Sequence, residues 1–307
     1  MTVSKFPALL FSLPKGNRHL AYSSVGDANS PHVLLCLPGL LETRATFDPL
    51  LKAADGLAGL RVISLDLCGR GDSSPLPGDQ GYTMQVYLED IVHFIRSELM
   101  PNGKPVPHIE VLGTSMGGIL AMYLAQDPQL HIQGLFLNDI GLSLNWMAIY
   151  GLYGSMKQGG RMPTPQELAQ QLNVTVGAVE AVQSTTHFDL PYKKDWKGMR
   201  FAHLLETFTG AVRLVYGGQS AVCTQDQLNE IKHALPACSL LQVPGAQHPA
   251  PYTEAVCDFI LRNLKPVAVQ KNLEFIQQDL WAQTTTPGQD QGFWPWLKRR
   301  YLGAKAK

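Results

Sequence analysis

Short apolar, β-rich runs alternate with stretches of helical periodicity along most of the 307-residue chain. This alternation is typical of a mostly parallel sheet with helices on both faces. Several runs are continuously apolar, as expected for strands that are buried on both faces. The predicted strands are Leu20–Val25, His32–Leu37, Arg61–Asp66, His108–Leu112, Gln133–Asn138, Val212–Tyr216 and Ser239–Val243, and the predicted helices are Thr83–Leu99, Met116–Gln126, Thr224–Leu235 and Thr253–Leu264.

The alternation stops between Gly141 and Thr209, where no strand is evident and the sequence predicts several short helices. One of them starts at Thr164–Glu167, which offers an N-cap threonine, a proline at the first helical position and a glutamate that can bond back. Asp195–Phe208 is expected to close this segment. We therefore predict a core of residues 1–140 and 210–265, a helical cap of residues 141–209 and a C-terminal extension of residues 266–307.

Composition limits the classes of partner and compartment. Lys plus Arg and Asp plus Glu both number 25, so no overall field draws the chain to nucleic acid, and a small-molecule substrate is expected. The cysteines are scattered without a C-x-x-C pair, and we interpret them as reduced core thiols. Neither a signal peptide in Met1–Leu13 nor an apolar stretch of membrane-spanning length is evident, which predicts a cytoplasmic protein.

The motif Gly113-Thr114-Ser115-Met116-Gly117 fits G-x-S-x-G and lies between a predicted strand and a predicted helix. In that context the serine occupies a sharp turn, and small residues two positions away on either side let the backbone bend. The N-terminus of the following helix favours the negative charge that forms during acyl transfer. Ser115 is therefore the candidate nucleophile, with an incidental serine in a glycine-rich turn as the alternative.

A nucleophilic serine needs a base, because its free hydroxyl is hardly ionised at neutral pH. His248 is the candidate, since it lies in Gly245–Pro249, just after the last predicted strand. That position places it at the same carboxyl edge of the sheet as Ser115. The order of serine before histidine also fits a strand–turn–helix nucleophile motif of this kind.

With Leu37–Leu40 after one predicted strand and Asp66–Ser73 after the next, these motifs resemble the α/β-hydrolase family over about Leu20–Leu264, specifically bacterial serine hydrolases with a helical cap. The resemblance implies an α/β-hydrolase fold, with a mostly parallel central sheet, helices on both faces and a helical cap insertion. It also implies an oxyanion hole made by the backbone N–H groups of Leu40 and Met116. It assigns the Asp66–Ser73 stretch a structural role only. We expect no cofactor and no metal.

The acid of the triad departs from the family pattern. The resemblance places it most often after the seventh strand, where this chain reads Gly217–Ala221 and has no carboxylate. Some lipases and dehalogenases use a position after the sixth strand, and Asp139 ends that strand here. Asp139 is therefore the predicted acid, with a role as helix cap as the alternative. Asp226 is a weaker candidate, because it is expected in the first turn of the following helix, pointing away.

The C-terminal segment lies outside the resemblance. Its residues 292–307 combine aromatic and basic side chains, a composition that can lie on a membrane surface or pack on a partner. A terminal extension docked on its own domain is the preferred interpretation.

The sequence as a whole predicts a serine hydrolase that cleaves a small apolar ester, or a thioester, through an acyl-enzyme intermediate. Cap residues would select the substrate by forming an apolar pocket, although such residues at helical spacing also serve as plain packing; they are Trp146, Met147, Tyr150, Tyr153 and Met156. A serine nucleophile argues against the Asp-dependent haloalkane dehalogenases and epoxide hydrolases. Carbon–carbon bond hydrolysis stays open, as does a ligand-binding receptor or weakly active pseudo-hydrolase on the same fold.

Overall fold

A computed structural model of the chain describes residues 3–14, 17–78, 81–100, 108–155, 161–182, 185–188, 190, 193–194 and 197–264. Its centre is an eight-stranded sheet with the order β1-β2-β4-β3-β5-β6-β10-β11. From β4 onward every neighbouring pair is parallel, whereas β1 and β2 pair antiparallel with each other and β2 with β4. The strands are β1 (Leu9–Ser12), β2 (His19–Gly26), β3 (His32–Leu37), β4 (Arg61–Leu65), β5 (His108–Thr114), β6 (Ile132–Asn138), β10 (Ala211–Gly217) and β11 (Ser239–Val243).

Each strand predicted from the sequence is present in this sheet, and β3 and β11 have the predicted bounds. The predicted helices are also present, while the seven-residue helix α1 was not anticipated. The helices around the sheet are α1 (Asp48–Ala54), α2 (Met84–Phe94) with its one-turn π-helical continuation Ile95–Leu99, α3 (Met116–Leu124), α7 (Gln225–Ala234) and α8 (Glu254–Asn263). The mostly parallel sheet with covering helices is therefore confirmed.

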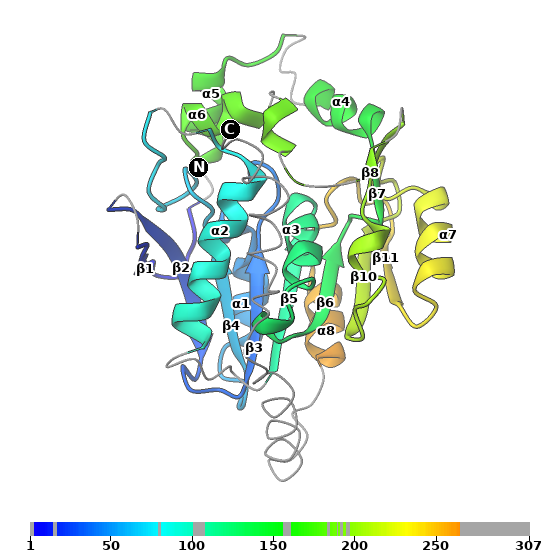
Figure 1. Ribbon diagram of the computed structural model, residues 1–307, viewed down its shortest axis with the longest axis horizontal. Helices are drawn as coiled ribbons and strands as arrows, with labels where there is room; N and C mark the ends of the chain where they lie inside the picture. The colour runs from blue at the N-terminus through cyan, green and yellow to red at the C-terminus, as the bar shows by residue number, and fades with distance from the viewer. Residues whose placement is uncertain are drawn as a thin grey trace, which may run out of the picture.

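The helices cover both faces of the sheet, with α2 and α3 in front and α1 and α8 behind in the view of Figure 1. Strand β3 shows why, because its side chains alternate between two apolar clusters. Val33, Leu35 and Leu37 pack in the cluster that holds α2 and α3, whereas Leu34 and Cys36 pack in the one that holds α1 and α8. A strand buried on both faces in this way must read as an unbroken apolar run.

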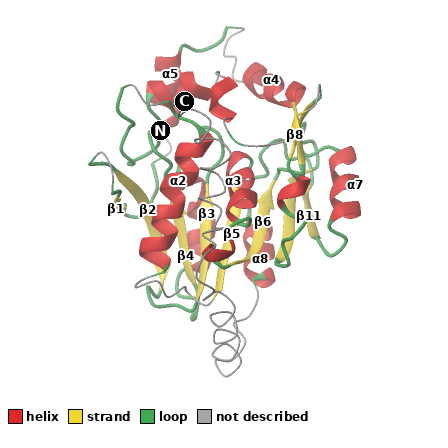
Figure 2. Cartoon of the chain, viewed as in Figure 1, coloured by secondary structure: helices red, strands yellow, loops and turns green. Residues whose placement is uncertain are grey.

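The prediction of a purely helical segment between Gly141 and Thr209 was wrong. A second sheet with the order β7-β9-β8 lies above one end of the main sheet (Figure 2). Its strands have two or three residues each, and β8 consists of two lysines, so these strands have no apolar alternation from which they could be predicted. The strands are β7 (Ser143–Asn145), β8 (Lys193–Lys194) and β9 (Gly198–Arg200), the helices α4 (Trp146–Ser155), α5 (Pro165–Leu172) and α6 (Val176–Val182), and the 3-10 turns Thr185–Phe188 and Ala202–Leu204.

Two details of this segment bear on the sequence predictions. The helix start at Thr164 is confirmed as a capping box, in which the Thr164 and Glu167 side chains each bond the other residue's backbone N–H. The expected closing segment Asp195–Phe208 instead contributes β9 and a 3-10 turn. The C-terminal extension lies outside the described residues.

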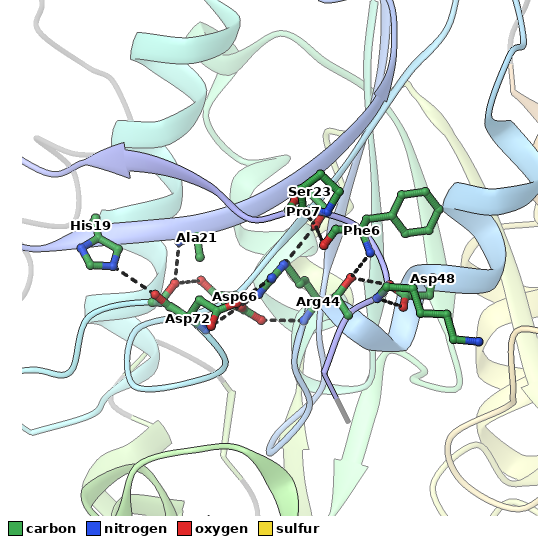
Figure 3. Close-up of polar contacts among 12 residues, drawn as sticks. Phe6, Pro7, His19, Ala21, Ser23, Arg44, Asp48, Asp66 and Asp72 are labelled. Carbon is green, nitrogen blue, oxygen red and sulfur yellow. Dashed lines mark hydrogen bonds and ion pairs between the residues drawn. The ribbon is translucent and has the colours of Figure 1, made fainter. Parts of the chain in front are cut away.

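A buried ion pair joins the loops that follow β3 and β4 (Figure 3). Asp66 is fully buried and accepts hydrogen bonds from the backbone N–H of Arg44 at 2.6 Å and from an Arg44 guanidinium nitrogen. The guanidinium also donates to Ser23 Oγ at 3.0 Å and lies 2.6 Å from a carboxylate oxygen of Asp72. Because Asp66 also accepts from the Asp72 N–H at 3.0 Å, one carboxylate fixes both loops.

Replacing this carboxylate tests how much the fold depends on it. Asp66→Asn should destabilise the protein by about 3 kcal/mol, because it leaves the largely buried Arg44 with only the half-exposed Asp72 as an anionic partner. The exposed pair Arg262–Asp258 provides the control, and Asp258→Asn should change stability by less than about 0.5 kcal/mol. Urea unfolding measures both, and equal losses would contradict a special role for Asp66.

Candidate active site

The nucleophile turn lies between β5 and α3, as the motif predicts. Ser115 has φ 49° and ψ −113°, a strained conformation for a residue with a side chain, and α3 begins at the next residue. Neither Gly113 nor Gly117 could carry a Cβ atom. At Gly113 it would collide with the backbone of Gly117 and Gly118, and at Gly117 with the carbonyl groups of Leu37 and Pro38. The motif therefore needs both glycines for backbone packing.

His248 lies in the loop after β11 and faces the serine. Its Nε2 atom is 2.9 Å from Ser115 Oγ, within hydrogen-bond distance. The imidazole is only 6 % exposed, so the pair is largely shielded from solvent. The structure thus brings together two side chains that are far apart in the sequence, at the carboxyl edge of the sheet.

Asp139 directly follows β6 and is fully buried. Its backbone has φ 58°, and its N–H donates to Val215 O on the adjacent β10 at 2.7 Å. This turn brings Asp139 Oδ2 to 3.4 Å from His248 Nδ1, slightly beyond the usual hydrogen-bond distance. Catalytic hydrogen bonds are often this long without substrate. No hydrogen bond between described residues engages either carboxylate oxygen of Asp139 or His248 Nδ1.

The sequence left two alternatives open, namely Asp139 as a helix cap and Asp226 as the acid. Asp139 does not cap a helix, because the next helix, α4, begins at Trp146 and the Asn145 side chain accepts the Met147 N–H. Asp226 lies in the first turn of α7, as expected. Ala221 is exposed in the loop after β10, where the family resemblance would place a carboxylate.

Leu40 and Met116 lie on the two loops to which the family resemblance assigns the oxyanion hole. Leu40 is in the loop after β3, and Met116 is the first residue of α3. The tight approach of Gly117 to Leu37 and Pro38 brings the two loops into backbone contact. Among the described residues, no hydrogen bond uses the backbone N–H of Leu40 or Met116, so both donors are available for an anionic oxygen.

Two charged residues that the sequence analysis did not select lie beside these loops. Glu42 Oε2 accepts the Gly39 N–H at 2.8 Å. Burial raises the pKa of Glu42, while the Gly39 N–H and the nearby His248 oppose that rise. Arg70 is fully buried and donates to Leu40 O at 2.7 and 3.2 Å. Their only sequence signal is a charge inside a loop rich in glycine or apolar residues, which predicts no particular contact.

A pocket of about 610 Å³ lies between the small sheet and α7. Its lining includes Leu144, Lys197, Arg200, Asp226 and Glu230, but not Ser115, His248 or Asp139. It is therefore a feature separate from the Ser115–His248 pair.

The sequence implies no metal, but the described part of the chain contains one cluster of possible ligands, at the opposite edge of the sheet. Ligand atoms of His32, His108 and Glu110 lie within 4.8 Å of one another. Glu110 accepts hydrogen bonds from His32 at 2.9 Å and from Arg213 at 2.5 Å. These bonds account for the buried carboxylate as part of an ion-pair network.

The residues expected to form an apolar substrate pocket are described only in part. Met147 is 73 % exposed, and the Lys194 ammonium lies 5.7 Å from the centre of the Trp146 ring. The side chains of Tyr150 and Tyr153, and all of Met156, lie outside the described part of the chain. Within that part, no helix has both the length and the apolar character needed to cross a membrane.

Comparisons with known proteins agree with this architecture. A family model described as alpha/beta hydrolase fold matches residues 32–159. A 3-hydroxybutyrate-oligomer hydrolase from Cupriavidus necator is 28% identical, over 76% of this chain and 88% of that protein. The mouse sn-1-specific diacylglycerol lipase ABHD11 is 24% identical, over 76% and 82% respectively.

Among solved structures, an alpha/beta hydrolase from Novosphingobium aromaticivorans superposes with a TM-score of 0.66 at 20% identity, covering 85% of this chain and 99% of that one. The matched family region includes Ser115 and Asp139. The chain therefore has the α/β-hydrolase fold, and it is similar to hydrolases over most of its length.

Proposed function

We propose that this hydrolase cleaves small, apolar carboxylic esters, or thioesters, through an acyl-enzyme formed on Ser115. The observation that carries the proposal is the 2.9 Å contact between Ser115 Oγ and His248 Nε2 on a strained strand-to-helix turn. The names of the two relatives support an ester substrate, because diacylglycerols are esters and 3-hydroxybutyrate oligomers are oligoesters.

In the proposed reaction, His248 Nε2 takes the proton of Ser115 as the serine oxygen attacks the carbonyl carbon of the ester. The carbonyl oxygen becomes an oxyanion, which the N–H groups of Leu40 and Met116 stabilise. His248 then gives the proton to the leaving alcohol, and an acyl-enzyme remains. A water molecule, activated by the same imidazole, hydrolyses it and restores the serine.

Asp139 is the proposed orienting acid. With its Nδ1–H directed at the Asp139 carboxylate, the imidazole presents an unprotonated Nε2 to the serine, and the buried negative charge stabilises the imidazolium that forms during attack. The segment from β7 to the 3-10 turn Ala202–Leu204 is proposed to act as the cap that selects the substrate.

The nucleophile and base are tested by substitution. Ser115→Ala and His248→Ala should each lower kcat for p-nitrophenyl butyrate on the order of 10⁶-fold, and the double variant should be no slower than either single one, because the two residues act as a unit. Circular dichroism and Tm check that the variants fold. Wild-type activity in Ser115→Ala would refute the proposed mechanism.

Covalent labelling separates the enzyme from a ligand-binding protein on the same fold. A fluorophosphonate probe should modify wild-type protein stoichiometrically at Ser115, and p-nitrophenyl butyrate should give a burst of nitrophenol of similar stoichiometry. Intact-mass and peptide mass spectrometry measure the modification. A folded protein that stays unlabelled would favour the receptor alternative.

The acid is tested by a change that preserves shape. Asp139→Asn should lower kcat on the order of 10⁴-fold, because an amide favours the wrong imidazole tautomer. Asp226→Asn is the matched control, and it should leave kcat unchanged because Asp226 lies on α7 and lines the separate pocket. Steady-state kinetics on both variants decides the assignment. A loss in Asp226→Asn with none in Asp139→Asn would transfer the role.

A further inference from the structure

Two side chains of opposite charge flank the one peptide group that carries the Leu40 N–H. On one side, Glu42 Oε2 accepts the Gly39 N–H at 2.8 Å. On the other, Arg70 donates two hydrogen bonds to the Leu40 carbonyl, from Nε at 3.2 Å and from a terminal nitrogen at 2.7 Å. The peptide groups before and after the Gly39–Leu40 unit are thereby held by side chains.

The direction of the Leu40 N–H follows from the peptide group itself. The Gly39 carbonyl accepts the backbone N–H of Glu42 at 3.3 Å, so it points into this turn. In a planar trans peptide the N–H points opposite to the carbonyl. The Leu40 N–H is therefore directed out of the turn, where no hydrogen bond from the described residues uses it.

Stability alone does not account for Arg70. The side chain is fully buried, yet none of the ion pairs between described residues includes it. Its described contacts are the carbonyls of Leu40 and Cys68 and the ring face of Tyr87, 4.6 Å from the guanidinium carbon. A buried cation held by carbonyls and a ring costs folding free energy that an apolar side chain would not.

We propose that Arg70 and Glu42 are positioning residues that clamp the Gly39–Leu40 peptide and hold the Leu40 N–H as a preorganised oxyanion donor. The clamp rests on the proposed acyl-enzyme function. Arg70 also adds a fixed positive charge behind the loop, in a water-excluded setting where charge acts strongly on a developing oxyanion. The Asp66–Ser73 stretch, which the family resemblance treats as structural, thereby gains a role in the reaction.

The proposal predicts a loss in kcat with little change in KM. Losing an oxyanion donor outright costs about 10²–10³ in kcat, so misplacing one in Arg70→Met should cost about 10- to 100-fold. Arg70→Lys, which keeps a charged donor, should recover part of that loss. Glu42→Leu should lower kcat about 10-fold, and Glu42→Gln, which keeps an acceptor for the Gly39 N–H, should recover most of it.

The readouts separate positioning from folding. Rates of p-nitrophenyl butyrate hydrolysis are divided by the number of sites that a fluorophosphonate titrates to completion, so unfolded protein does not count. An aryl trifluoromethyl ketone, whose serine adduct carries an oxyanion, should lose affinity in parallel with the fall in kcat. A purely structural role would leave both quantities at wild-type values per titrated site.

Arg213→Met is the matched control, since Arg213 is also a buried arginine but bonds Glu110 near the opposite edge of the sheet. It should lower Tm while leaving kcat per site intact.

Wild-type kcat per site in Arg70→Met and Glu42→Leu, or a loss confined to KM, overturns the clamp. If Arg70→Met does not fold, Arg70→Lys and Glu42→Leu decide alone. An unlabelled wild-type protein overturns the proposed function and the clamp together, whereas a labelled wild type with unchanged kcat per site in both Arg70→Met and Glu42→Leu overturns the clamp only.

Discussion

The rest of the candidate site depends on a close backbone approach between the Ser115 turn and the loop after β3. Gly117 packs directly on the carbonyl groups of Leu37 and Pro38, so the turn that carries Ser115 and the loop that carries Leu40 share one contact surface without intervening side chains. This approach fixes the position of the Ser115 turn relative to the Leu40 loop. Because interiors are close-packed, even one added methyl group here would have to move a strand end.

Charged side chains then hold the outer parts of the same loops. Asp66 binds Arg44 just beyond the Leu40 loop, and Arg70 reaches back from the Asp66 loop to Leu40 itself. The two contacts form a closed ring of interactions between the ends of β3 and β4. Leu41 lies between Leu40 and Arg44 in the sequence and packs in an apolar cluster with side chains of α5 and α6, so this loop is held by apolar contacts as well as by charged ones.

Much of this could be predicted from sequence, for physical reasons that differ between elements. The buried parallel strands were found because burial on both faces forces apolar runs, and Ser115 and His248 because a strained turn and a strand end leave recognisable residues around them. The small sheet was missed, since strands of two or three residues such as Lys193–Lys194 have no period to detect. Glu42 and Arg70 were missed because their partners are backbone carbonyl and N–H groups, which every residue has.

The hydrogen bonds between the Asp66 loop and the junction between α5 and α6 affect how the sequence of such a protein can change during evolution. Gly71 N–H donates to Asn173 O, and Thr175 N–H donates to Gly69 O, each at 2.8 Å, so the junction between α5 and α6 is attached through main-chain atoms on both sides. Main-chain hydrogen bonds do not depend on side-chain identity. The side chains of α5 and α6 can therefore be exchanged during evolution, or in a designed library, while the junction that links these helices to the Asp66 loop keeps its bonding pattern.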